Sequence, residues 1–395
     1  MTRFVSCQLP TGTPDRIFRG EKSGSQEEDM MLLKKTPEKY ALSHEFTANT
    51  DLAAAEVPAT EDHAAWWMPN VSRKEMKQLM KREDARPLAN YSLWLVLLVA
   101  SGVVAYSTLW TWWAIPAFLV YGTIYSSCDP RSHDLGHGAT FRTRWLNSLF
   151  CNLTLFMTLK EPIDWRWRHT RHHTDTIHVG LDPEILVKRP ADLIKIAADF
   201  FFIMQAKGEL KGVVQHAFGI VTSDARLYVP RSEWRKMFWV SRLYLTCILG
   251  VVASCFAFGT IAPLLFIWGP RFYANWLYFF GFLTQHAGLA EDSYDHRLNT
   301  RTFIMNPVGE FLYANLNYHI EHHIHPLIPY YNLPVLNRMI KDELPHTYQS
   351  LWECMTEVLP AMWRQAFEVE YFVRRELPSS AQHRTSGGPS FAPAE

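Results

Sequence analysis

Eight of the 17 histidines fall into three short clusters whose spacing suggests metal chemistry. The clusters are His133 and His137, then His169, His172 and His173, and finally His319, His322 and His323. Residues three or four positions apart lie on one face of a helix, so each cluster would aim its imidazoles at one point. Imidazole binds iron, zinc, copper and nickel. Eight of them exceed the needs of one tetrahedral zinc and suit two ions that share a cavity.

A ninth candidate ligand is His286, which closes a long apolar stretch at the depth that the clusters would occupy. His178, His296 and His325 lie near the clusters in sequence and are predicted to support the site or to face solvent. Five further histidines stand alone and are expected to have no metal role: His44, His63, His216, His346 and His383.

Carboxylates inside or beside the clusters are candidates to hold the rings, because a metal-bound imidazole needs an acceptor for its second N–H. Asp134, Asp175 and Glu321 are the first candidates, and Asn315 could hold a water on the metal, as could Asn317. Other carboxylates lie close in sequence: Asp182, Glu184, Glu291 and Asp295. Each of these side chains is equally compatible with an ordinary surface position.

Two long apolar stretches must position the clusters. Residues 87–128 contain no Asp, Glu, Lys or Arg. As one straight helix they would be about 63 Å long, twice the roughly 30 Å of a hydrocarbon core. We therefore expect two antiparallel spans, 91–107 and 110–127. Residues 243–290 contain one such charge, Arg271, and halving them puts a turn near 265–268. The Arg271 side chain would then extend out of the hydrocarbon core toward the membrane surface, or alternatively it would face a substrate.

Cations flank both stretches on one side only. They precede and follow each hairpin, whereas the expected turns carry none except Arg271. The positive-inside bias places the termini, the long loops and the histidine clusters in the cytoplasm. The predicted fold is an all-α membrane protein, with four transmembrane helices in two hairpins and a cytosolic helical cap that carries the histidines. Buried helices of a soluble protein are the alternative, which one-sided cations argue against.

Composition limits the remaining possibilities. The 395 residues carry 39 Lys+Arg and 39 Asp+Glu, which argues against a nucleic-acid partner. None of the six cysteines forms a CxxC pair, which argues against a zinc ribbon or a disulfide framework. Residues 1–60 are predicted to be a disordered extension, 61–378 the membrane domain and 379–395 a disordered tail. A capping box, Ser72–Glu75, predicts a short helix. The uncharged run 145–159 is too short to cross a membrane.

The clusters and the topology together resemble the membrane fatty-acid-desaturase superfamily, whose pattern is HxxxH, HxxHH and HxxHH. The resemblance covers roughly residues 91–359, and His286 corresponds to the additional ligand that the superfamily supplies near its last span. It implies a non-haem di-iron centre that uses O2 and two supplied electrons to remove hydrogen from an unactivated C–H bond. All nine histidines would then be metal ligands and catalytic.

Two pairs of segments resemble particular branches of this superfamily. Residues 285–292 and 295–302 resemble the dihydrorhizobitoxine-desaturase and rhizopine-catabolism branch, whereas 317–323 and 342–346 also resemble sphingolipid desaturases. The sequence departs from the family at Ile324-His325-Pro326, where Phe-Pro is common. It contains no haem-binding His-Pro-Gly-Gly motif. The resemblance therefore implies a separate electron donor of cytochrome b5 or ferredoxin type, with its reductase, and the endoplasmic reticulum if the source is eukaryotic.

Four functions are compared. The favoured one is a desaturase that introduces a C=C bond into a fatty acyl or other lipid-like substrate, and the runner-up is a hydroxylase acting on an aliphatic or specialised metabolite. A zinc-dependent membrane hydrolase would use His133-Asp134-Leu135-Gly136-His137 as an HExxH-like motif, but it leaves two clusters unused. A metal transporter would usually carry its histidines within the spans or in low-complexity tracts.

Overall fold

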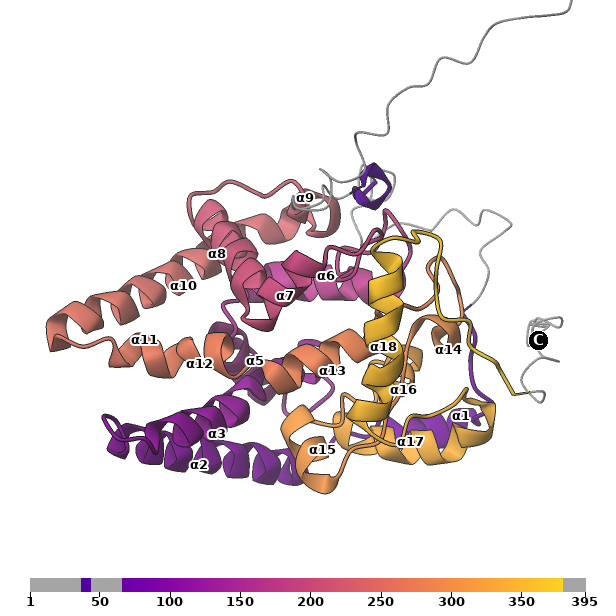
Figure 1. The fold of residues 1–395 in the computed structure, drawn as a ribbon, viewed down its shortest axis with the longest axis horizontal. Helices are drawn as coiled ribbons and strands as arrows, with labels where there is room; N and C mark the ends of the chain where they lie inside the picture. The colour runs from indigo at the N-terminus through magenta and orange to yellow at the C-terminus, as the bar shows by residue number, and fades with distance from the viewer. Residues whose placement is uncertain (1–36, 44–65, 379–395) are drawn as a thin grey trace, which may run out of the picture. The chain divides into compact units, whose positions relative to one another are not determined.

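Helices make up all the regular structure of the described residues. The computed structural model describes residues 37–43 and 66–378, which belong to the unit that covers 35–395. Over these ranges the β-structure is limited to three isolated bridges. The all-helical part of the predicted fold is therefore confirmed (Figure 1). The predictions for residues 1–36, 44–60 and 379–395 lie outside the described residues.

The first apolar stretch forms a helical hairpin. Helix α2 spans Ala85–Ser107, is long and apolar enough to cross a membrane, and packs against α3, Ala114–Ser126. The indole of Trp94 lies between them and donates a 2.9 Å hydrogen bond to the Ile124 carbonyl. The opposite face of α2 is apolar and more than half exposed, as at Val96, Val99 and Val103. An apolar face that is exposed in the protein alone is what contact with lipid requires.

The second stretch has one long helix and a broken return leg. Helix α10, Arg231–Phe258, is the second helix that is long and apolar enough to cross a membrane. The chain returns through α11 (Ala262–Ile267), α12 (Gly269–Tyr273) and α13 (Trp276–His286). The predicted turn at 265–268 is wrong. The reversal follows α10 directly at Gly259, whose φ of 62° favours glycine, and the prolines that begin α11 and α12 interrupt the return leg.

Arg271 neither reaches outward to solvent nor lies in a turn. It is fully buried in α12, and its Nη2 lies 2.6 Å from Oδ2 of Asp129. Lys160 Nζ lies 2.8 Å from the other carboxylate oxygen of Asp129. The Arg271 guanidinium also lies over the rings of Phe202 and Tyr278, 4.5 Å from each centroid. These contacts tie the return leg to the helix that carries the first histidine cluster.

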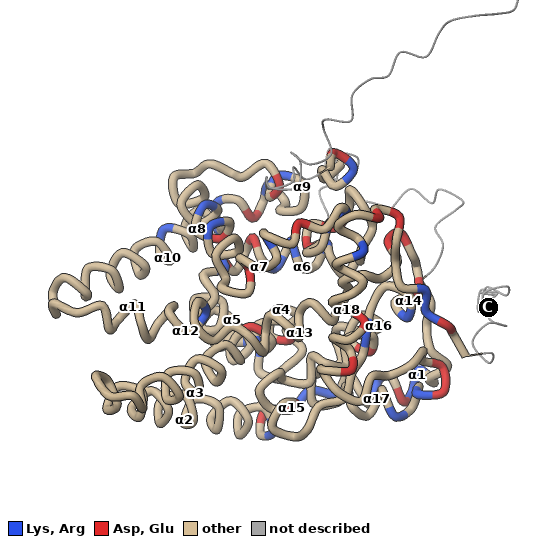
Figure 2. The backbone as a smooth tube through the Cα atoms, in the orientation of Figure 1, with Lys and Arg blue, Asp and Glu red and all other residues tan. Residues whose placement is uncertain are grey.

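The two hairpins are almost free of charged residues. Figure 2 shows tan backbone along most of α2, α3, α10 and α11, and charged residues gathered on the helices around α1, α6, α8 and α17. Figure 1 shows both hairpins extending to the same side of these helices. Two candidate spans in such an arrangement support a membrane protein.

The remaining helices carry and surround the histidines. One residue separates the end of α3 from the start of α4. Helix α1 begins with the Ser72–Glu75 capping box, so this prediction is confirmed. Helix α5 covers most of the run 145–159 and keeps Trp145 and Leu149 exposed on one face.

The bounds of these remaining helices are α1 Arg73–Leu79, α4 Cys128–Gly136, α5 Arg144–Met157, α6 Pro162–Thr174, α7 Leu193–Phe200, α8 Ile203–Ala217, α9 Ala225–Tyr228, α14 His296–Asn299, α15 Pro307–Tyr313, α16 His319–Ile324, α17 Leu333–Ile340 and α18 Leu351–Gln365, with short 3-10 helices η2 Glu38–Tyr40, η4 Tyr330–Asn332 and η5 Lys341–Glu343.

A short N-terminal segment, residues 37–43, is ordered although it lies within the predicted disordered extension. It contains η2, and its Tyr40 is buried. The Tyr40 hydroxyl donates to Glu291 Oε1 at 2.6 Å and accepts from the Arg189 amide at 2.9 Å. The Ser43 amide donates to the Gly180 carbonyl at 2.8 Å. We call residues 37–43 the strap.

Candidate metal centre

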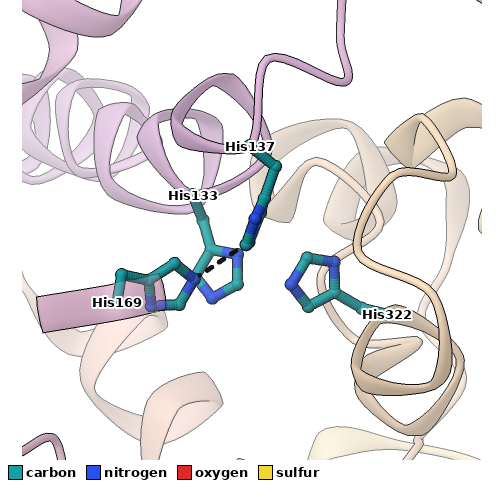
Figure 3. A group of neighbouring side chains, drawn as sticks. All are labelled: His133, His137, His169 and His322. Carbon is teal, nitrogen blue, oxygen red and sulfur yellow. Dashed lines mark hydrogen bonds between the residues drawn. The ribbon is translucent and has the colours of Figure 1, made fainter. Parts of the chain in front are cut away.

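The nine predicted histidines come together from four helices. His133 and His137 come from α4 and its C-cap, His169, His172 and His173 from α6, His286 from the end of α13, and the last three from α16. One nitrogen from each of His133, His137, His169 and His322 lies within 4.8 Å of the others. Figure 3 shows these four rings pointing toward one another. His172, His286 and His323 form a second such group.

The other two rings join these groups through their Nε2 atoms. His173 Nε2 lies 3.1 Å from Nε2 of both His169 and His322, so it extends the first group to five rings. His319 Nε2 lies 3.2 Å from Nε2 of His286 and 3.1 Å from Nε2 of His323, so it extends the second group to four. The rings of His173 and His323 stack at 4.3 Å, which puts the two groups side by side.

The nitrogen spacing is what imidazoles that share a metal ion would have. His169 donates its Nδ1 proton to Glu184 Oε2 at 2.8 Å, which leaves a lone pair on its Nε2. That lone pair faces the Nε2 atoms of His137 and His173, each 3.1 Å away. Two ligands about 2.1 Å from one ion are about 3.0 Å apart at a right angle and about 3.4 Å apart in a tetrahedron. The observed spacing of 3.1–3.2 Å lies between these two values, so it fits imidazoles that share one ion.

The environment keeps most of these rings neutral, which is the form that binds metals. Burial, with smaller contributions from neighbouring histidines, holds the pKa of His133, His137 and His322 well below its usual range. At His172 burial also lowers the pKa, but Asp182 outweighs it and the net shift is upward. Burial alone would raise the pKa of Glu184, yet His169 and the nearby Arg168 hold it well below the usual range.

Four rings are oriented from behind by groups that lie outside the histidine-bearing helices. His172 donates from Nδ1 to Asp182 Oδ2 at 2.8 Å, as His169 does to Glu184. His286 donates from Nδ1 to the Asn299 carbonyl at 2.8 Å, and His323 Nδ1 lies 3.2 Å from Thr176 Oγ1. Such contacts fix the tautomer and direct Nε2 inward. Asn299 and Thr176 were missed in the sequence, because neither residue type nor spacing distinguishes them there.

The five side chains first predicted to support the rings or a water all make hydrogen bonds or ion pairs with other groups. Asp134 accepts from Thr140 Oγ1, and Asp175 pairs with Arg171. Glu321 accepts from Thr302 Oγ1 at 2.6 Å and from Asn337, and Asn315 donates from Nδ2 to the Tyr330 carbonyl at 3.1 Å. Asn317 likewise donates from Nδ2 to the Phe303 carbonyl at 2.8 Å. Glu321 is one or two positions from each ligand of its own helix, so it points away from the ligand face.

The remaining histidines lie outside the two groups. His296 stacks on Trp66, with ring centroids 4.0 Å apart, and its ring lies 5.1 Å from that of His323. His178 lies against Trp66 and Tyr294, and His325 is half-buried. His346 pairs with Glu353, and His216 lies near Thr222. His44, His63 and His383 lie outside the described residues.

This arrangement defines a class: a helical protein with two histidine groups that could bind metal and two helices that could cross a membrane. A family model described as "Fatty acid desaturase" matches residues 110–354, so the chain belongs to the fatty acid desaturase family. The human sphingolipid delta(4)-desaturase/C4-monooxygenase is 26% identical over 301 residues, which cover 71% of this chain and 84% of that protein. The sn-1 oleoyl-lipid 12-desaturase of Arthrospira platensis is 24% identical over 297 residues, which cover 68% of this chain and 82% of that one.

The family and its members define the reaction type. This chain is a membrane oxidoreductase of the desaturase or hydroxylase type. Its histidine groups could bind metal, and two of its helices could cross a membrane.

Proposed function

We propose that the protein is a di-iron desaturase that introduces a C=C bond into a fatty acyl or other lipid-like substrate. The observation that carries the proposal is the pair of facing groups in which Nε2 atoms lie 3.1–3.2 Å apart. In this proposal all nine histidines are metal ligands. The first ion is held by His133, His137, His169, His173 and His322, and the second by His172, His286, His319 and His323.

Bound irons would supply the O2-reducing chemistry that a side chain cannot provide. Desaturation converts CH2–CH2, O2, two electrons and two protons into CH=CH and two waters. The chain's own residues keep the imidazoles neutral and oriented. Asp182 accepts a hydrogen bond from Nδ1 of His172 and Glu184 accepts one from Nδ1 of His169, which orients both rings, and burial of the rings excludes bulk water.

Hydroxylation is the second candidate, because the same inputs convert C–H into C–OH and one water. The name of the human relative includes both desaturase and C4-monooxygenase activity. The likeness of residues 285–302 to the dihydrorhizobitoxine and rhizopine branch also leaves a specialised metabolite as a possible substrate. Family membership argues against the zinc hydrolase and the transporter.

The proposed setting is a four-span membrane domain at residues 61–378 with its metal centre facing the cytoplasm, in the endoplasmic reticulum if the source is eukaryotic. The apolar hairpins and the flanking cations support this arrangement. Electrons would come from a separate cytochrome b5 or ferredoxin with its reductase. The printed names of relatives from Arabidopsis thaliana and Nostoc specify ferredoxin.

The test is metal analysis followed by product analysis. Purified protein should contain about two irons per chain, and His322→Ala should lower this value. Cells that coexpress the protein with a donor and its reductase should accumulate a product lighter by two hydrogens, whereas a product heavier by one oxygen would indicate the hydroxylase. One zinc per chain with turnover in the absence of O2 would overturn the proposal.

A further inference from the structure

The loop that carries Asp182 and Glu184 has no regular structure of its own. This loop, residues 177–189, is described throughout, lies between α6 and α7 and contains no helix or strand. We call it the carboxylate loop, because Asp182 and Glu184 accept hydrogen bonds from the Nδ1 atoms of His172 and His169. Contacts with other segments must therefore hold the two carboxylates where they meet their rings.

The strap provides one such contact through the ring of Tyr40. Ile177 and Ile185 of the carboxylate loop are 5% and 7% exposed, and they form one hydrophobic cluster with Tyr40. Ile185 directly follows Glu184, and the Ile177 amide donates to Asp182 Oδ2 at 2.8 Å. Displacing Tyr40 would leave part of this cluster open to water, which costs free energy, so both carboxylates are coupled to the position of the strap.

The backbone of the strap also lies directly on the carboxylate loop, at Gly180. The Ser43 amide donates to the Gly180 carbonyl at 2.8 Å. Gly180 has a φ of 78°, and a Cβ there would lie 3.3 Å from the Lys39 carbonyl oxygen and 3.5 Å from that of Ala41. Glycine is favoured at this φ and lets the two backbones approach each other. The strap therefore contacts the loop at two places, the Tyr40 ring and Gly180.

The Tyr40 hydroxyl joins the carboxylate loop to a second segment that follows a histidine ligand. It accepts from the Arg189 amide at the end of the loop and donates to Glu291, which lies five residues after His286. Arg189 Nε also lies 3.2 Å from Glu291 Oε1, so the hydroxyl adds to a direct link between the two segments. His172 and His286 belong to the same histidine group. This link therefore helps to set the relative position of two rings of that group.

We propose that Tyr40 is a positioning residue for the metal centre and holds the carboxylate loop where Asp182 and Glu184 orient their rings. No hydrogen bond or ring contact joins Tyr40 to either histidine group in the described structure, so it acts through the loop. The inference rests on the proposed function, because it takes the nine histidines as metal ligands. Its consequence is reciprocal: if the docked strap strengthens metal binding, bound metal must strengthen docking of the strap by the same factor.

The first measurement is the iron(II) affinity of the purified full chain, determined by chelator competition without oxygen. Tyr40→Ala removes both the ring and the hydroxyl and should weaken iron binding about tenfold. Tyr40→Phe keeps the ring over the isoleucines and loses only the hydroxyl, so it should weaken iron binding about threefold. The matched control is Val213→Ala, which removes a buried side chain from another hydrophobic cluster and should lower thermal stability without changing the iron affinity.

The second measurement tests the reciprocal effect and needs no variant. Iron(II) should slow hydrogen exchange at the Ser43 amide of the wild-type protein and leave exchange unchanged at the Gly309 amide, which donates to Asn306 on α15. Unchanged Ser43 exchange would overturn the proposal.

The proposal would also be overturned by wild-type iron affinity in a folded Tyr40→Ala protein, or in Tyr40→Phe if Tyr40→Ala does not fold. An equal loss of iron affinity in Val213→Ala would do the same, because the effect of Tyr40 would then be a general loss of stability. Both measurements follow iron binding and not turnover. A chain whose iron affinity depends on Tyr40 but which forms no alkene would therefore contradict the desaturase proposal alone.

Discussion

Two acidic side chains of one loop orient rings of the second histidine cluster. Asp182 and Glu184 lie ten and fifteen residues beyond the histidines that they contact, on a segment that folds back over α6. The sequence placed both near the clusters but could not rank them above Asp134 or Glu321. Helical spacing identifies which residues share a face, whereas the path of a returning loop depends on contacts distant in sequence.

Replacing Asp182 by Asn tests this role. The variant loses the strong acceptor of the His172 Nδ1 proton, so metal affinity should fall about 10- to 100-fold. Chelator competition on the purified protein measures the change. Asp134→Asn is the matched control, because Asp134 lies next to a ligand but accepts from Thr140 and contacts no ring in the described structure. Equal metal loss in both variants would contradict the assignment.

Helices α4 and α6 meet at a glycine that separates two ligands. A Cβ on Gly136 would lie 2.2 Å from Trp165 Cζ3, and Trp165 stacks on His169 at 5.0 Å. Gly136→Ala should therefore push α6 away, cost about 1–3 kcal/mol of stability and lower metal content. Thermal unfolding and metal analysis measure both effects. Gly208→Ala, where the new methyl would meet no atom within 4 Å, should keep the metal and the stability.

The strap is held at its centre by one hydroxyl group. Tyr40→Phe removes the bonds to Glu291 and the Arg189 amide, so the strap should detach more often. Hydrogen exchange should become faster at the Arg189 and Ser43 amides, the two strap contacts made by backbone N–H groups. Tyr106→Phe, which changes an exposed tyrosine on α2, is the control. Unchanged exchange in Tyr40→Phe would show that the Tyr40 hydroxyl does not hold the strap in place.

The return leg of the second hairpin shows where helix-length arguments fail. Dividing an apolar stretch into two equal helices ignores Pro263 and Pro270, which begin new helices. Arg271 was expected outside because charge is costly in lipid. Its partner Asp129 is 142 residues away in sequence, so no local pattern could reveal that the charge is paired.

The whole molecule divides into apolar hairpins and a charged part that holds the histidines. Val99 on the exposed face of α2 tests whether lipid covers the hairpins. Val99→Arg should cost about 2.5–3.5 kcal/mol of insertion free energy if this face meets the hydrocarbon core. The fraction of protein resistant to carbonate extraction should then fall, whereas Val99→Leu should leave it unchanged. Equal extraction of both variants would place this face outside the membrane.

The nine rings come from helices that are scattered between residues 133 and 323. If metal ions bind between these rings, each newly made chain completes its folding only when it binds its metals, because the free energy of metal binding also stabilises the folded state. We expect the amount of this protein in a cell to follow the nutritional supply of iron, with starved cells degrading chains that have never become active.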